Sequence, residues 1–239
     1  MSFNNSMAIS PKFEADMDGW LAALPCFSGA TDMSVSPMLP ADFVLAEKYF
    51  QSFSQHAFRV GNDIDEKEKY LLSPTCCYPV FYNLSGKKLH KDTLLSNKCF
   101  CFRCEKYYAP GERQISFLMR EYIFLSADLA VVQAWIEDVK QQVAGLIRQI
   151  GLDVELEKAT DPFFNANDFR QKFQENQNLK SEFIVDGLAC GSINLHLKAF
   201  SLSCDIKSSD GGDLYSACFG MGYNRIYSKY ESRLAQAVA

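Results

Sequence analysis

The chain has 239 residues, 48% of them hydrophobic and 22% charged, which is typical of a globular protein that can bury a sizeable core. Its net charge of −5 argues against broad nucleic-acid binding, because such binding depends on phosphate neutralisation by lysine and arginine. No apolar run reaches the ~18 residues that span a bilayer, and the first residues lack a signal pattern. We therefore expect a cytoplasmic protein without a membrane partner. In a reducing compartment its nine cysteines are expected to be core residues or metal ligands, not disulfides.

The first third of the sequence is broken by prolines. Residues 11–25 predict a short helix that Pro25 closes, and residues 33–40 predict extended chain interrupted by Pro37 and Pro40. Residues 41–55 are weakly helical. Residues 69–84 predict two strand-like pieces around their prolines.

The clearest helix is predicted over residues 126–151, with Ser126 as N-cap and Gly151 as stop. Its apolar residues recur at spacings of three and four. Residues 181–187, 192–209 and 213–222 then predict strands. The expected fold class is α+β, a mixed and largely antiparallel sheet flanked by helices, in a single domain over residues 1–239.

A charged hairpin is predicted over residues 99–125. Residues 99–105 alternate along one strand, residues 109–111 (Ala-Pro-Gly) make the turn, and a second strand follows. The hairpin would bring together Arg103, Glu105, Arg113, Phe117 and Glu121. Arginines suit phosphates, a carboxylate accepts from an exocyclic amine, and a ring stacks on a base, so a nucleotide site is one interpretation. An exposed hairpin with cross-strand ion pairs is the other.

Two further segments have ordinary interpretations. Cys101 and Cys104 form a lone CxxC without a second pair at zinc-finger spacing, so we interpret both as packing or hairpin residues. The basic segment over residues 86–98 is either a solvated loop or a local anionic-partner patch.

The hairpin resembles motif 2 of the class II aminoacyl-tRNA synthetases, in which an FRCE-like strand, a loop and an RxxxF strand follow one another; here these are residues 102–105 and Arg113 to Phe117. A second match lies in CFGMGYNRI, where Gly220, Gly222 and Arg225 resemble motif 3.

Five blocks are similar to a narrower family, the amino acid:carrier protein ligases, which are truncated homologues of the atypical zinc-dependent seryl-tRNA synthetases. The blocks are LLSPTCCYP (71–79), MREYIF (119–124), ATDPFF (159–164), SINLH (192–196) and YSACFGMGYNR (215–225). The resemblance implies a class II synthetase-like catalytic domain without a tRNA-binding arm. It also implies an enzyme that activates a small amino acid with ATP and Mg²⁺ and loads it onto the phosphopantetheine of an acyl or peptidyl carrier protein.

The resemblance assigns roles to individual residues. It places the family's catalytic Zn²⁺ on Cys77, Glu121 and Cys218, with the substrate's α-amine in the open fourth position. ATP contacts fall on Arg103, Glu105, Arg113, Phe117 and Arg225, and Arg103 and Arg225 also serve catalysis. Asp161, Asn194 and His196 match positions near the substrate; from the residues alone, Asp161 is equally a turn residue and His196 a core histidine.

Departures from the family pattern are confined to a few positions. Asn224 stands where the family has an acidic residue before the motif 3 arginine, and Leu197 and Lys198 replace polar residues after His196. Residues 1–40 supply a short motif 1 segment, from which we expect a homodimer. A carrier protein, usually acidic, would dock on Lys87, Lys88, Lys91 and Lys98.

Two other hypotheses stay open at this stage. A tRNA synthetase is disfavoured by the acidic composition and by the lack of a tRNA-binding domain in this sequence. A non-catalytic, class II synthetase-like paralogue with a binding or regulatory role is disfavoured because the arginines and all three zinc ligands are retained.

Overall fold

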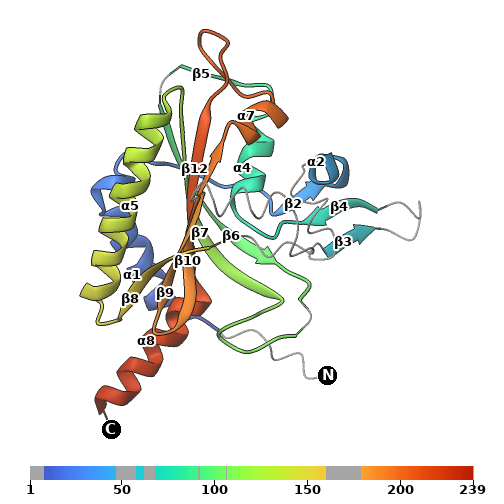
Figure 1. The fold of residues 1–239 in the computed structure, drawn as a ribbon. Helices are drawn as coiled ribbons and strands as arrows, with labels where there is room; N and C mark the ends of the chain where they lie inside the picture. The colour runs from blue at the N-terminus through green and yellow to red at the C-terminus, as the bar shows by residue number, and fades with distance from the viewer. Residues whose placement is uncertain are drawn as a thin grey trace.

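A sheet of seven described strands runs through the computed structural model, which describes residues 8–46, 58–61, 68–90, 92–105, 107–159 and 179–238 (Figure 1). In order across the sheet, the strands are β1 (Thr31–Met33), β6 (Thr93–Phe102), β7 (Ser116–Ser126), β12 (Tyr215–Gly222), β10 (Leu188–Leu197), β9 (Lys180–Val185) and β8 (Val154–Lys158). Only the β1–β6 pair is parallel among these neighbours. This confirms the predicted α+β class with a mainly antiparallel sheet.

Two small sheets extend the main one. Strands β2 (Met38–Pro40), β4 (Glu68–Leu72) and β3 (Phe58–Gly61) form an antiparallel sheet that lies beside α4 and α2 in Figure 1. Strands β5 (Lys88–Leu89) and β11 (Lys207–Ser208) pair in parallel at the top of the view.

Helices cover both faces of the main sheet (Figure 1). One face packs against α1 (Pro11–Ala22), the short η1 (Pro25–Phe27), α5 (Leu129–Gln149) and the start of α8 (Tyr223–Val238). The other packs against α4 (Cys77–Leu84) and α7 (Ala199–Ser203). The helix predicted over 11–25 is confirmed, whereas the one over 41–55 is described only as α2 (Ala41–Ala46). None of the helices among the described residues is long and apolar enough to cross a bilayer.

Two strand predictions are wrong. Residues 77–84 form helix α4, because Pro79 lies in the first turn, where a proline costs no helical hydrogen bond. This helix is apolar on most sides and buried, so it lacks the amphipathic period that would identify it in the sequence. Residues 199–203 likewise form α7 between β10 and β11.

Helix α5 begins later than predicted. Asp128, not Ser126, is the N-cap, and its carboxylate accepts a hydrogen bond from the Ala130 amide at 2.8 Å. Ser126 still ends β7, and its hydroxyl accepts from the Asp128 amide at 3.0 Å. Gly151 ends the helix with φ +84°, as expected for a left-handed C-terminal residue.

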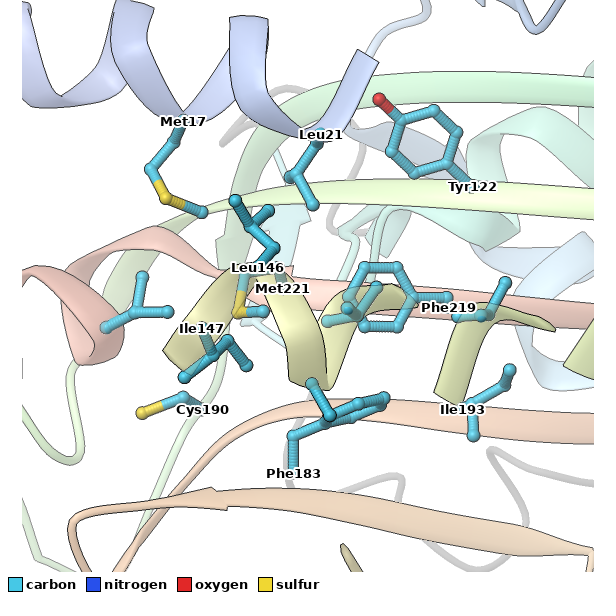
Figure 2. Close-up of a cluster of buried hydrophobic side chains, with 14 of the residues drawn as sticks. Met17, Leu21, Tyr122, Leu146, Ile147, Phe183, Cys190, Ile193, Phe219 and Met221 are labelled. Atoms are coloured by element: carbon cyan, nitrogen blue, oxygen red, sulfur yellow. The ribbon is translucent and has the colours of Figure 1, made fainter. Parts of the chain in front are cut away.

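The core under α1 and α5 is apolar and contains large side chains, among them Tyr122, Phe183, Phe219 and Met221 (Figure 2). One ionic network crosses the edge of this core. Asp18 of α1 accepts from Arg120 at 3.0 Å and from Tyr223 at 2.7 Å, and it pairs with Lys98 at 2.5 Å. Lys98 is therefore engaged within the protein, and its place in the predicted docking patch stays a prediction. Lys91 lies outside the described residues.

Candidate functional site

The central strands place alternate residues on the face that is covered by α4. On β7 these are Phe117, Met119 and Glu121, and Gly222 and Gly220 on β12 lie opposite Met119 and Glu121 in the antiparallel register. The next residue on this face of β12 is Cys218. A strand advances about 6.7 Å every two residues. The ring of Phe117 therefore lies on the same face as the Glu121 carboxylate and the Cys218 thiol, two such steps along β7.

The aromatic end opens into a surface cleft. Its lining includes Arg103, Glu105, Arg113, Phe117, Gly222 and Arg225. The structure therefore brings together the five residues that the resemblance assigns to ATP. Glu121 does not line this cleft and lies deeper, so the predicted five-residue hairpin cluster is divided into two neighbouring groups.

Two arginines of the cleft, Arg113 and Arg103, already have partners. Arg113 Nη1 lies 2.8 Å from Glu105 Oε2, and the guanidinium of Arg103 lies 5.0 Å from the ring centroid of Phe117. Arg103 also donates through Nε to the Pro74 carbonyl at 3.0 Å. These contacts hold the arginines over the cleft. A polyphosphate and a base that bound there could replace the present partners of the arginines.

Arg225 is held by backbone carbonyls. Its Nη1 donates to the Ala189 carbonyl at 2.7 Å, and its Nε donates to the Glu112 carbonyl. Burial, followed by the charge of Arg103, lowers the pKa of Arg225. An anion in the cleft would relieve this repulsion, which is what a phosphate site requires.

Asn224, the departure before the motif 3 arginine, has a different structural task. It is buried, and its side-chain oxygen accepts from the Leu118 amide at 2.8 Å. Asn224 therefore fastens the start of α8 to β7, while the backbone holds the arginine.

Cys77, Glu121 and Cys218 converge at the inner end of this face. One ligand atom from each lies within 4.8 Å of the others, and all three residues are buried. Cys77 comes from the first turn of α4, Glu121 from β7 and Cys218 from β12. Two thiols and a carboxylate are a donor set that Zn²⁺ accepts, and three ligands leave one coordination position open.

The electrostatics of this cluster also fit a cation. Burial raises the pKa of Cys77, of Glu121 and of Cys218. A cation bound among the three groups would favour their deprotonated forms and so oppose this effect of burial. Thr75 is the neighbour that the sequence did not single out: its hydroxyl donates to Glu121 Oε2 at 2.9 Å and lies 3.1 Å from Cys77 Sγ. Such outer contacts orient metal ligands.

Of the three predicted substrate residues, two lie beside Cys218. His196 Nε2 lies 3.2 Å from Cys218 Sγ, and its Nδ1 lies 3.2 Å from the Ser216 hydroxyl. Asn194 stands opposite Cys218 in the β10–β12 register, with Nδ2 3.8 Å from Sγ. Asp161 lies outside the described residues. The resemblance gave no hint that His196 and Asn194 would contact a proposed metal ligand.

From the sequence we interpret Cys101 and Cys104 as packing or hairpin residues. Cys104 is exposed, whereas Cys101 is buried together with Cys76 and Cys99. Cys76 is the N-cap of α4, directly before Cys77, the first residue of this helix. The sequence also missed Lys180 and Glu182 of β9, which line the cleft.

No model of a known protein family matches the sequence, and no curated protein is significantly similar to it. Solved structures do match. The seryl-tRNA synthetase of M. kandleri, in complex with A. aeolicus tRNASec, superimposes with TM-score 0.76 at 16% identity and covers 91% of this chain. Prolyl-tRNA synthetases match over 91% of the chain as well: that of Giardia lamblia with prolyl-adenylate (TM-score 0.72, 15% identity) and that of Cryptosporidium parvum with halofuginone and AMPPNP (TM-score 0.68, 11% identity).

The chain spans about half the length of these synthetases, since the matches cover 50%, 45% and 44% of them. At these identities the likeness concerns the fold. The superpositions with the seryl- and prolyl-tRNA synthetases each cover 91% of this chain, with TM-scores of 0.68 to 0.76. The chain therefore has the fold of a class II aminoacyl-tRNA synthetase catalytic domain.

Proposed function

We propose that the protein activates a small amino acid with ATP and transfers it to the phosphopantetheine thiol of a carrier protein. The observation that carries the proposal is the continuous face of β7 and β12, where the arginine-lined cleft adjoins the Cys77–Glu121–Cys218 cluster. A nucleotide in the cleft and an amine at the cluster would be side by side. The carrier-protein step is supported by the five sequence blocks and by no contact in the structure.

ATP binding would exchange existing contacts for new ones. A γ-phosphate would draw Arg113 from Glu105, which frees the carboxylate to accept from the adenine amine. The base would stack on Phe117, the ring that Arg103 now covers, and Arg103 would turn to the α-phosphate and the substrate carboxylate. Arg225 would hold the γ-phosphate with Arg113, and Mg²⁺, when bound with ATP, would supply further charge neutralisation.

Cys77, Glu121 and Cys218 would hold Zn²⁺, with Thr75 fixing the orientation of Glu121. The ion, when bound, supplies an open position that a neutral α-amine fills. His196 and Asn194 support Cys218 from the neighbouring strand. The chain thus fixes the amine at one end of the face and aims the carboxylate at the cleft.

The reaction joins two anions, so the residues act mainly by positioning and by neutralising charge. The substrate carboxylate attacks the α-phosphorus of ATP, pyrophosphate leaves, and Arg103 neutralises the charge that builds on the α-phosphate. The carrier's thiol then attacks the acyl carbon of the adenylate, loses its proton and releases AMP.

The test is amino-acid-dependent ATP–pyrophosphate exchange over a full amino-acid panel, on protein of known zinc content. Exchange with one or two small amino acids is the expected result. Absence of exchange from zinc-loaded protein that binds ATP would contradict the activity and favour the non-catalytic alternative. Transfer is tested separately by mass spectrometry of carrier proteins bearing phosphopantetheine: exchange without any aminoacyl thioester would retain the activation step and overturn the carrier assignment.

A further inference from the structure

A second group of three thiols lies next to the proposed zinc cluster. Cys76 is the N-cap of α4, and Cys99 and Cys101 lie two residues apart on β6. All three are buried, and their sulfur atoms lie within 4.8 Å of one another. The adjacent residues Cys76 and Cys77 therefore point into different clusters.

The sulfur atoms are spaced as ligands of one ion would be. Cys76 Sγ lies 3.2 Å from Cys99 Sγ and 3.6 Å from Cys101 Sγ. Sulfurs that each lie about 2.3 Å from a tetrahedral ion are separated by about 3.8 Å, so a small relaxation would admit the ion. A disulfide would require a separation of about 2.05 Å and could link only two of the three.

A polar group supports the thiols. Asn97 is buried beside them, and its Nδ2 donates to the Cys76 carbonyl at 3.0 Å and lies 3.7 Å from Cys99 Sγ. Its Oδ1 is buried without a hydrogen-bond partner among the described residues. If the three thiols only filled an apolar gap, a buried amide beside them would be unfavourable, because an unmatched polar atom in the interior is costly. An N–H aimed at sulfur is the kind of outer contact that metal-bound thiolates receive.

We propose that Cys76, Cys99 and Cys101 form a second metal site, separate from Cys77, Glu121 and Cys218, that takes a thiophilic ion, Zn²⁺ or Cu⁺. Three sulfur ligands without a carboxylate make this the softer of the two sites, and soft thiolate sites select these ions. Binding would release the thiol protons to solvent. The bound ion would cross-link β6 to the first turn of α4. The inference does not rest on the proposed function.

Metal stoichiometry tests the site. The full chain, purified anaerobically with reductant, would be loaded with Zn²⁺ alone or with Zn²⁺ and then Cu⁺, desalted and analysed by mass spectrometry for metals. Wild-type protein should retain two Zn²⁺ ions, or one Zn²⁺ with Cu⁺ at the second site after sequential loading. The Cys99→Ser/Cys101→Ser variant should lose one equivalent, and so should Cys77→Ser/Cys218→Ser. Cys104→Ser, which changes an exposed thiol, is the matched control and should retain both.

X-ray absorption identifies which site is filled and needs no activity. Zinc in Cys77→Ser/Cys218→Ser should have a sulfur-dominated shell at about 2.3 Å, whereas zinc in Cys99→Ser/Cys101→Ser should show oxygen or nitrogen at about 2.0–2.2 Å beside sulfur. If a double variant fails to fold, the stoichiometry and mean sulfur shell of wild type still decide. A total of one metal equivalent at most under either loading, a second equivalent that survives Cys99→Ser/Cys101→Ser, or a Cys76–Cys99 disulfide in the reduced preparation would overturn the proposal.

Discussion

At the scale of single residues, the cleft consists of charges that already have partners. Arg113 is paired with Glu105, and Arg103 covers the Phe117 ring. The strand predicted from Arg113 begins later, at Ser116, and Arg113 instead forms an isolated bridge with Ala109. Arg113 and Phe117 nevertheless both line the cleft.

Arg113→Ala should weaken ATP binding about 10- to 100-fold, since a charged hydrogen bond to phosphate contributes about 1.5–3 kcal/mol. The measurement is the Kd for ATP by calorimetry. Arg113→Lys keeps the charge but not the two-pronged set of donors, so its Kd for ATP should lie between those of wild type and Arg113→Ala. Unchanged ATP affinity in Arg113→Ala would show that this arginine does not hold the phosphates.

Glu121→Gln should lower zinc affinity by at least about 100-fold, because even outer contacts of a metal are worth about 10- to 100-fold. In metal-free protein the same substitution should increase the stability of the fold. Burial raises the pKa of Glu121 above its ordinary 4.5, so the buried carboxylate costs stability once the pH exceeds the unfolded value. Metal-free Glu121→Gln should therefore be more stable than metal-free wild type above about pH 5. Urea unfolding with a chelator checks this, and equal stability at pH 8 would contradict it.

At the scale of elements, helix α1 is tied to the sheet through one carboxylate. Asp18 receives Lys98 from β6, Arg120 from β7 and Tyr223 at the start of α8. Burial acts to raise the pKa of Asp18, but the hydrogen bonds from Lys98 and Tyr223 and the charge of Arg120 bring it below 3.8. The helix is therefore held electrostatically as well as by its apolar face.

Asp18→Asn should cost about 2 kcal/mol of unfolding free energy at pH 7, as expected for hydrogen bonds to charged groups. Because the folded pKa lies below 3.8, wild type keeps this contribution above about pH 4 and loses it as the pH falls through the folded value. The difference between the two proteins should shrink at pH 3. Urea unfolding at both pH values is the measurement. Asp16→Asn, which breaks only the exposed pair with Lys12, is the control and should cost about 0.5 kcal/mol or less.

At the scale of the whole molecule, the two cysteine clusters join segments that are distant in sequence. The Cys77–Glu121–Cys218 cluster connects α4, β7 and β12. An ion bound there would favour the folded chain, because the ligands converge only in that state. The homodimer expected from residues 1–40 stays a prediction.

Zinc at a hundred times its Kd should add about 2.7 kcal/mol to stability, which corresponds to a rise in Tm of about 5–10 °C for a chain of this size. The rise should diminish toward acid pH, since the ligands must lose their protons to bind the ion. Differential scanning calorimetry with zinc and with chelator checks this. An equal rise in Cys77→Ser/Cys218→Ser would assign the effect to other groups.

The sequence was sufficient for the fold class and for five residues of the cleft, but not for Lys180 and Glu182 or for every element. Cys77 was named as a zinc ligand while its segment was predicted as strand, because a short buried helix has no amphipathic period to reveal it. The Cys76–Cys99–Cys101 group was missed for a different reason: a cysteine in a strand has the same pattern as any small apolar residue. Thr75 could be recognised only once Glu121 had been placed beside it.

Neighbouring residues of strand β7 face two different kinds of site on opposite sides of the sheet. Arg120 faces the carboxylates of Asp18 and Asp32, while Glu121 faces the thiols on the other side. Inserting or deleting one residue between Ser116 and Arg120 would exchange the two faces, with a guanidinium among the thiols and a carboxylate beside Asp18. Lineages of this protein should therefore tolerate substitutions in this strand far more readily than changes in its length, and any length change should occur in pairs of residues or within the 107–115 loop.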